Sequence, residues 1–424
     1  MESSSSSSWV VHFDFALYML VFLSYRDPLF VVRCLLFWRQ GFEFGLINGF
    51  SLKGVSVMVD KRVRKLANLF VSYSVHVQPK ENVLIQGSNL AFPLIDDLYR
   101  ECLLADAYPF VLPVLDVQYT FFQVAKEHQL RYVSPFDRAI LENTDVSIGI
   151  FCEPNPKKLT GVDPAKIGMR QASRSDLVEL RMKREAEGKF RWGALPYPGA
   201  AEAQEAEMAM EEYEDFVYSS CLVDRDDPVS EWKKVRAEQG KLCDFLNTVK
   251  KVRVVGDDTD LTYSVDGRKW INCCGEKNMP DGEVFTAPVE NSVNGTVRFT
   301  FPGLFYGKEI EDISLAFKDG RVVKASAAKG DELLQQILKI EGADRLGEAA
   351  IGTNYGITKF TKSMLFDEKM GGTIHMALGF NPIHETGGLN KSAVHWDVLK
   401  DMKKDSEIYA DDKLIYKNGR FVIV

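Results

Sequence analysis

The sequence predicts an α/β protein with an N-terminal α/β domain on a mostly parallel sheet and a C-terminal, mainly antiparallel β (α+β) domain. Two observations indicate this. From residue 58 to about 200, helical periodicity alternates with short apolar runs, as in a parallel sheet with crossover helices. After Val252, short β-type runs follow one another with turns between them. A chain of 424 residues is also long for one core. We therefore expect domains at 58–250 and 251–424.

The first half gives a regular succession of elements. We expect helices and strands to alternate over residues 63–70 (helix), 82–87 (strand), 94–103 (helix), 108–114 (strand), 121–128 (helix) and 145–152 (strand). No G-x-G-x-x-G or Walker pattern follows any of these strands, so the sequence gives no sign of a nucleotide site. Residues 201–250 are helix-rich, with one helix opened by Asp227-Pro228, and are expected to join the domains.

The second half carries the β pattern. Asp-Gly pairs at Asp266-Gly267 and Asp319-Gly320 are typical of hairpin turns, so each predicts two paired strands. Two later strands are expected in GGTIHMALG and AVHWDVL. These strands carry the residues that bear on function.

Composition limits the class of protein. The net charge is −8 with dispersed Lys and Arg, which argues against nucleic acid and membrane surfaces as partners. Seven cysteines show no zinc-ribbon pattern and favour a reducing, cytoplasmic location. Residues 1–57 begin with a serine run, and their longest uncharged stretch, 15–25, is shorter than the roughly 20 residues that span a bilayer. We interpret them as a disordered or non-native leader outside the fold; a targeting or anchoring role is the alternative.

Three of the six histidines lie close together near the C-terminus: His375, His384 and His395. His395 and Asp397 are two residues apart on a predicted strand, so both side chains project from one face. His375 lies near the middle of a glycine-bounded strand, where a neutral imidazole can bind a first-row metal. The alternative for each is a hydrogen-bonded core histidine.

Three acids strengthen the metal interpretation. Glu283 follows a Pro-Asp-Gly turn at the start of an apolar run, and Glu348 opens a strand after a helix expected to end at Gly347. Burying such an acid alone costs several kcal/mol, which a cation would offset. Glu368 lies ahead of the His375 strand and could join them, or could lie on an exposed turn beside Asp367 and Lys369. The set suits two divalent ions, zinc, cobalt or manganese, that polarise a carbonyl and lower the pKa of a bridging water.

Taken in order, these segments resemble the thermophilic-type metallo-aminopeptidases, the family of aminopeptidase T and aminopeptidase S. The resemblance covers residues 58–424 and is carried by TDLTYSVDGRKW, MPDGEVFTAP, GTVRFTFPG, GADRLGEAAIGTN, LFDEK, GGTIHMALG, ETGGLNKSAVHWD, PYPGAA and EEYEDFV. It implies a homodimer that binds two divalent cations. The implied ligands are Glu283, Glu348, His375, His395 and Asp397, with Glu368 as a further one.

One position departs from the family pattern. Members usually have a catalytic tyrosine seven residues after the first metal histidine, and this chain has Pro382 there. His384 is the candidate substitute because an imidazole can donate to an oxyanion; a surface histidine is the alternative.

We therefore predict an aminopeptidase that hydrolyses the N-terminal residue of short peptides, with Glu283 or Glu348 handling protons. The alternatives are a metal-dependent amidase or esterase on non-peptide substrates, and a catalytically impaired cation-binding relative.

Overall fold

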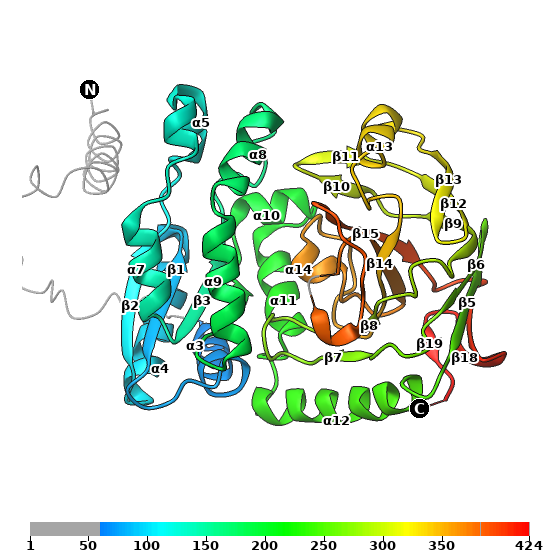
Figure 1. Ribbon diagram of the computed structural model, residues 1–424. Helices are drawn as coiled ribbons and strands as arrows, with labels where there is room; N and C mark the ends of the chain where they lie inside the picture. The colour runs from blue at the N-terminus through cyan, green and yellow to red at the C-terminus, as the bar shows by residue number, and fades with distance from the viewer. Residues whose placement is uncertain (1–59, 382, 424) are drawn as a thin grey trace, which may run out of the picture. The chain divides into compact units, whose positions relative to one another are not determined.

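The computed structural model describes residues 60–381 and 383–423 (Figure 1). Residues Val59–Val424 form one compact unit. The leader predicted at 1–57 lies outside the described residues. Within them, none of the helices combines the length and the apolar character that a membrane span needs. The division into two domains at residue 250 stays a prediction.

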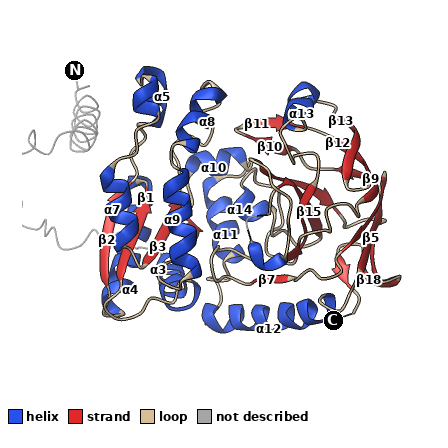
Figure 2. Cartoon of the chain, in the orientation of Figure 1, coloured by secondary structure: helices blue, strands red, loops and turns tan. Residues whose placement is uncertain are grey.

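The first part of the unit is a four-stranded sheet of order β2-β1-β3-β4, in which all three neighbouring pairs are parallel. The strands are β1 (Asn82–Gly87), β2 (Tyr108–Pro113), β3 (Val146–Phe151) and β4 (Arg191–Pro196). The helices are α3 (Lys61–Leu69), α4 (Phe92–Leu104), α5 (Gln118–Val124), α6 (Glu127–Leu130), α7 (Pro135–Asn143), α8 (Pro164–Ala172) and α9 (Ser175–Ala186) (Figure 2). A π-helical turn (Phe70–Ser74) follows α3, and a 3₁₀ turn (Asn89–Ala91) precedes α4.

The predicted parallel sheet is confirmed, because the apolar runs at 82–87 and 145–152 form its adjacent strands β1 and β3. The single helix predicted over 121–128 is wrong. Ala125 takes an extended backbone conformation (φ −66°, ψ 134°), which ends α5 and separates it from α6.

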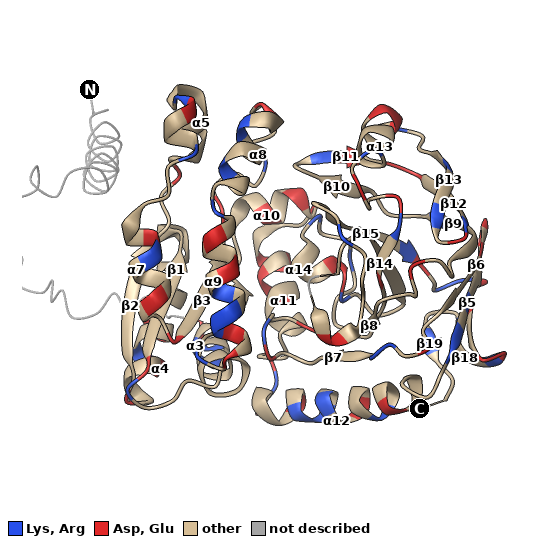
Figure 3. Ribbon diagram, viewed as in Figure 1, with Lys and Arg blue, Asp and Glu red and all other residues tan. Residues whose placement is uncertain are grey.

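Three helices connect this sheet to the rest of the chain: α10 (Ala200–Glu205), α11 (Met210–Ser220) and α12 (Pro228–Leu246). In α12, Trp232, Leu242 and Leu246 are buried, while Glu231 and Lys234 form an ion pair. Charges of both signs run along α9 and α12 in Figure 3. This spacing of apolar and charged residues makes α12 a helix with one buried face.

Among the described residues, the C-terminal part contains two large antiparallel sheets and a two-stranded one. The larger has the order β13-β12-β9-β6-β5-β17-β18-β19 and the smaller β16-β15-β14-β8-β7. The larger sheet consists of β13 (Arg321–Ser326), β12 (Ile313–Lys318), β9 (Asn294–Phe299), β6 (Thr259–Ser264), β5 (Lys251–Gly256), β17 (Glu407–Ala410), β18 (Lys413–Lys417) and β19 (Arg420–Phe421). The smaller consists of β16 (His395–Asp401), β15 (Thr373–Gly379), β14 (Leu346–Gly352), β8 (Glu283–Thr286) and β7 (Ile271–Cys273).

The remaining elements are short: the pair β10 (Gly303–Phe305) and β11 (Lys308–Ile310), the helices α13 (Asp331–Ile337) and α14 (Met364–Asp367), and a 3₁₀ turn (His384–Thr386). The hairpin predicted at Asp319-Gly320 is confirmed as the β12–β13 pair. The hairpin predicted at Asp266-Gly267 is wrong, because the chain there passes from β6 in the larger sheet to β7 in the smaller one.

The five-stranded sheet has two different faces. Residues at alternate positions point to opposite sides of a strand. On one side Val284, Ile351, Ile374, Met376 and Val398 are buried in the same hydrophobic core. The other side therefore carries their immediate neighbours in the sequence, and several of these are acids or histidines.

Candidate metal centre

The neighbours of those core residues form a compact polar cluster. Glu283 begins β8, Glu348 lies on β14, His375 lies on β15, and His395 and Asp397 lie on β16. We call these five residues the histidine donor set. Ala377 of β15 is opposite both Glu348 and Asp397, so the register brings these two acids to either side of one residue.

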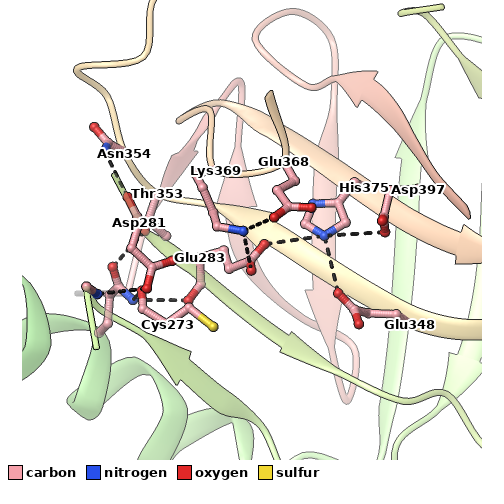
Figure 4. Close-up of polar contacts among 12 residues, drawn as sticks. Cys273, Asp281, Glu283, Glu348, Thr353, Asn354, Glu368, Lys369, His375 and Asp397 are labelled. Carbon is pink, nitrogen blue, oxygen red and sulfur yellow. Dashed lines mark hydrogen bonds and ion pairs between the residues drawn. The ribbon is translucent and has the colours of Figure 1, made fainter. Parts of the chain in front are cut away.

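The imidazole of His375 lies at the centre of this set. Its Nε2 is 3.3 Å from Glu283 Oε2, 3.4 Å from Glu348 Oε1 and 4.0 Å from Asp397 Oδ1. The second histidine is close by, with His395 Nε2 3.2 Å from Asp397 Oδ2. Figure 4 shows Glu283, Glu348 and Asp397 directed toward His375. The structure thus brings together five of the six predicted ligands around one point.

Two glycines allow the backbone to present the acids. Gly282 has φ +121°, and a Cβ there would lie 2.8 Å from the Cβ of Asn354. Gly347 lies at a register shift in β14, where a Cβ would lie 2.3 Å from the carbonyl oxygen of Gly379. The prediction that a helix ends at Gly347 is wrong: α13 ends at Ile337, and Gly347 belongs to a β-bulge that sets the direction of Glu348.

The hydrogen bond of His395 leaves one ring nitrogen available. Its Nδ1 lies 2.7 Å from the carbonyl oxygen of Phe380, which only an N–H on Nδ1 can satisfy. In a neutral imidazole Nε2 then carries the lone pair. This is the usual arrangement of a histidine that binds a metal through Nε2.

The pKa values of the histidine donor set are shifted because three carboxyl groups and two imidazoles are buried together. Burial raises the pKa of Glu283 and of Glu348. Burial would lower the pKa of His375, but Glu348, Glu283 and Asp397 outweigh it and raise that pKa to about 9. In the same way Asp397 raises the pKa of His395 to about 10, whereas His395 lowers the pKa of Asp397 to about 2 against the effect of burial. The cluster therefore favours positive charge.

The donors fit a divalent cation. Glu283 Oε2 and Asp397 Oδ1 are buried and have no hydrogen-bond partner among the residues the structure describes. Such atoms are costly unless a ligand pairs with them. Imidazole nitrogen and carboxylate oxygen are ligands that zinc, cobalt and manganese accept. Glu348, His375 and Asp397 also hold their ligand atoms within 4.8 Å of one another.

Sequence reasoning missed Lys369, which lies beside this set. Its side chain is 1% exposed, and its Nζ lies 2.9 Å from Glu283 Oε1 and also contacts Glu368 Oε1. Burial would lower the pKa of Lys369, but Glu283 and Glu368 raise it well above its usual value. The exposed turn considered for Glu368 is wrong, because its own side chain is only 19% exposed and its neighbours Asp367 and Lys369 are buried. In the structure Glu368 contacts this ammonium group.

Gln239 of α12 is a second residue that the sequence did not indicate. Its Nε2 lies 2.8 Å from Asn272 Oδ1, 2.9 Å from the Cys273 carbonyl and 3.1 Å from the Glu283 carbonyl. Its Oε1 accepts a hydrogen bond from Thr353 Oγ1 at 2.9 Å. The side-chain amide of Gln239 thus links β7, β8 and the segment after β14 through hydrogen bonds, one of them to the backbone of Glu283 itself.

The cluster opens into a cavity of about 550 Å³. Arg181 of α9 and Trp192 of β4 line it together with residues of the five-stranded sheet, so both parts of the unit contribute. His384 is exposed, and the structure does not place it in the lining. Its catalytic role stays a prediction.

Comparison with known proteins identifies the family. The family model for thermophilic metalloproteases (M29) matches residues 59–421. The chain belongs to family M29. This confirms the predicted family, and it makes the protein a metal-dependent hydrolase of peptide bonds.

The relatives of this M29 protein span nearly its whole described length. It is 27% identical to Aminopeptidase 2 of Geobacillus stearothermophilus, covering 80% of this chain and 92% of the relative. It is also 27% identical to aminopeptidase AmpS of Bacillus subtilis (strain 168), covering 85% and 98%. The structure of wild-type AmpT from Thermus thermophilus matches with a TM-score of 0.74 at 22% identity, covering 86% of this chain and 99% of that one. This likeness confirms the predicted fold class.

Proposed function

We propose that this M29 protein is an aminopeptidase that removes the N-terminal residue of short peptides with the help of two divalent ions. The observation that carries the proposal is the convergence of Glu283, Glu348 and Asp397 within 4.0 Å of His375 Nε2 beside a cavity large enough for a small ligand. The names of the relatives, which are aminopeptidases, support the same activity.

The histidine donor set would hold the ions. Its three carboxylates and two imidazoles offer enough oxygen and nitrogen atoms for two ions, and zinc, cobalt and manganese all suit them. A bound divalent ion polarises the scissile carbonyl and makes a water molecule nucleophilic at neutral pH. His395 is held in the right tautomer for this by the Phe380 carbonyl. Glu368 stays a predicted further ligand, although its carboxylate contacts Lys369.

Between the two candidate proton carriers, Glu348 is better supported than Glu283. Glu283 Oε1 is held 2.9 Å from the ammonium group of Lys369, which makes its carboxylate a weaker proton acceptor. Burial raises the pKa of both carboxyl groups, but among the described residues Glu348 contacts no lysine that would oppose this effect. A carboxylate with a raised pKa is the stronger base at neutral pH, so we assign the proton transfer to Glu348.

The cavity has charges suited to both ends of a short peptide. Glu385 can pair with the α-ammonium group, and Arg181 and Lys269 can pair with the terminal carboxylate. Glu276 and Lys277 also line the cavity, but they already form ion pairs with Arg236 and Glu185. Recognition of the ammonium group distinguishes an exopeptidase from a general amidase. From the family resemblance and the composition we also propose a homodimer in the cytoplasm.

The test compares an amino-acid anilide with its N-acetylated form, using protein dialysed against a chelator and then supplied with zinc, cobalt or manganese. We expect no hydrolysis without metal, restored hydrolysis with metal, and a strong preference for the free amine. Equal rates on both substrates would favour the amidase or esterase alternative. Full activity in a verified metal-free sample would refute the metal mechanism.

A further inference from the structure

A second group of donor atoms adjoins the histidine donor set. Cys273 ends β7, Asp281 precedes β8 and Glu283 begins it, and these three offer ligand atoms that all lie within 4.8 Å of one another. Glu368 is not one of these three, but its carboxylate contacts Lys369 Nζ, which also contacts Glu283. We call Cys273, Asp281, Glu283 and Glu368 the lysine donor set (Figure 4). A thiol and three carboxylates are donors of the kind that bind divalent metals.

The cation in this group is an amino group of the chain itself. Lys369 Nζ lies 2.9 Å from Glu283 Oε1 and contacts Glu368 Oε1, and its side chain is 1% exposed. Asp281 is 3% exposed, and its Oδ1 has no hydrogen-bond partner among the described residues. Its Oδ2 accepts a hydrogen bond from the backbone N–H of Gly275 at 2.7 Å, which fixes the carboxyl group. The group thus retains an acceptor that the ammonium group does not satisfy.

The charge balance of this group depends on the ammonium ion of Lys369. Two glutamates held by one buried cation become uncompensated when that cation is removed, and leaving such charges unpaired costs several kcal/mol. A divalent ion from solution can restore the balance, because Cys273, Asp281 and Glu283 already hold their ligand atoms close together and Glu368 contacts the same ammonium group as Glu283. With the ammonium present, a second cation in the same place would meet its repulsion.

We propose that Lys369 is the built-in cation of the lysine donor set and that it keeps divalent ions out, so that replacing it with a neutral residue creates a further metal site formed by Cys273, Asp281, Glu283 and Glu368. The inference rests on the proposed function only through Glu283, which both donor sets share, and through Glu368, which is a predicted further ligand of the proposed metal centre. Lys369 thereby confines metal ions to the histidine side of the cluster.

The experiment titrates chelator-treated protein with cobalt(II), using the wild-type chain, Lys369→Ala and Lys369→Gln. It measures the equivalents bound and the near-ultraviolet charge-transfer absorption that a cysteine thiolate gives when it binds cobalt. The histidine donor set contains no thiol, so its ions give no such band. We expect both variants to bind one equivalent more than the wild type and to show the band, which the wild type lacks.

Matched variants locate the new site. Adding Cys273→Ser to Lys369→Ala should abolish the band, whereas Cys274→Ser should leave it, because the sulfur of Cys274 faces Glu276 at 3.9 Å. Lys400→Gln is the control for losing a buried lysine. Lys400 is also 1% exposed, but its Nζ donates to the backbone carbonyls of Asp257 and Arg298. It should bind as many equivalents as the wild type.

The outcomes separate this inference from the proposed function. Unchanged binding and no band in both Lys369 variants would overturn the inference while leaving the histidine site intact. A wild-type chain that binds no cobalt, beside a variant that binds one equivalent with the band, would support the inference and refute the proposed metal centre. Failure of both variants to fold even with cobalt present would also overturn it, because the ion should replace the lost charge.

Discussion

Gln239 offers the most direct test of how the fold positions Glu283. In Gln239→Leu the side chain stays apolar near the backbone, is one bond shorter and loses both polar atoms. The substitution removes the hydrogen bonds to Asn272 Oδ1 and to the carbonyls of Cys273 and Glu283, and the one that Thr353 Oγ1 donates. Gln239 is 5% exposed, so solvent cannot replace these hydrogen bonds.

The two N–H groups of the amide are shared among its three acceptors, so with the bond from Thr353 Gln239 makes three full hydrogen bonds. At about 1 kcal/mol each, they predict a loss of about 3 kcal/mol in the free energy of unfolding. The usual unfolding entropy per residue converts this into a fall in Tm of about 4 °C for a unit of this size. Because β7, β8 and the segment after β14 lose their common anchor, Glu283 also becomes less well placed. We expect metal affinity to fall roughly 10- to 100-fold, the usual effect of losing a group that orients a ligand.

Calorimetry of metal-free protein gives Tm, and a cobalt titration gives the affinity. Gln335→Leu is the control, because the Nε2 of that glutamine makes longer contacts, 3.2 Å to the Ala325 carbonyl and 3.4 Å to Asp331 Oδ1, and neither partner is a donor residue. A Gln239→Leu protein with a Tm within about 1 °C of wild type would refute the energetic argument, since this threshold is about one quarter of the expected shift. A lower Tm with unchanged cobalt affinity would refute the positioning role.

Three further predictions concern the histidines and the N-terminal segment. His395→Ala should lower metal content and activity together, whereas His384→Ala should keep its metal. Elemental analysis and kcat, measured for both variants, check this. A kcat reduced roughly 100-fold in His384→Ala with its metal retained would assign His384 the role of the missing tyrosine. In metal-free protein the pKa values of His375 (about 9) and His395 (about 10) lie above the ordinary 6.5, so their pairing with the acids stabilises the fold fully below about pH 6.5 and is lost as the pH rises through 9 to 10. Metal-free Tm should therefore fall between pH 7 and pH 10, and a rise would contradict the pKa assignment. A chain beginning at Met58 should fold and keep full activity; an inactive product beside an active full chain would disprove the interpretation of residues 1–57 as a leader.

Much of the site could be predicted because apolar and polar residues alternate along a strand with one buried face, and this alternation is visible in the sequence. His395 and Asp397 share a face of β16, with Trp396 between them buried on the other. Glu283 likewise follows a turn and opens a strand whose next residue, Val284, enters the core. In each case, residues only one or two positions away in the sequence indicate which face of the strand the side chain lies on.

The features that were missed depend on residues distant in the sequence. Lys369 has the appearance of a surface turn residue until Glu283, far along the chain, is brought to its Nζ. Asp266-Gly267 has good hairpin chemistry, but whether the following strand pairs with β6 or with β8 is decided by the packing of two sheets. Gln239 lies in an ordinary amphipathic helix, and its importance is visible only once the smaller sheet is packed against that helix and the Glu283 carbonyl accepts a hydrogen bond from its amide.

The pairing of β14 with β15 at the bulge decides which face of the sheet carries Glu348. The register shift between Leu346 and Glu348 places Glu348 opposite Ala377, on the same side of the sheet as His375. Gly347 is the extra residue of the bulge, so removing it would leave Leu346 opposite Leu378 and Glu348 opposite Ala377. Deleting the regularly paired Ala349 would instead move Glu348 one position along the ladder, and a one-residue slip turns a side chain to the other face. The carboxylate would then enter the hydrophobic core, and the cluster would lose a donor although no donor residue had been changed. Among natural and engineered variants, single-residue insertions and deletions in β14, β15 and β16 should therefore be far more damaging than conservative substitutions there.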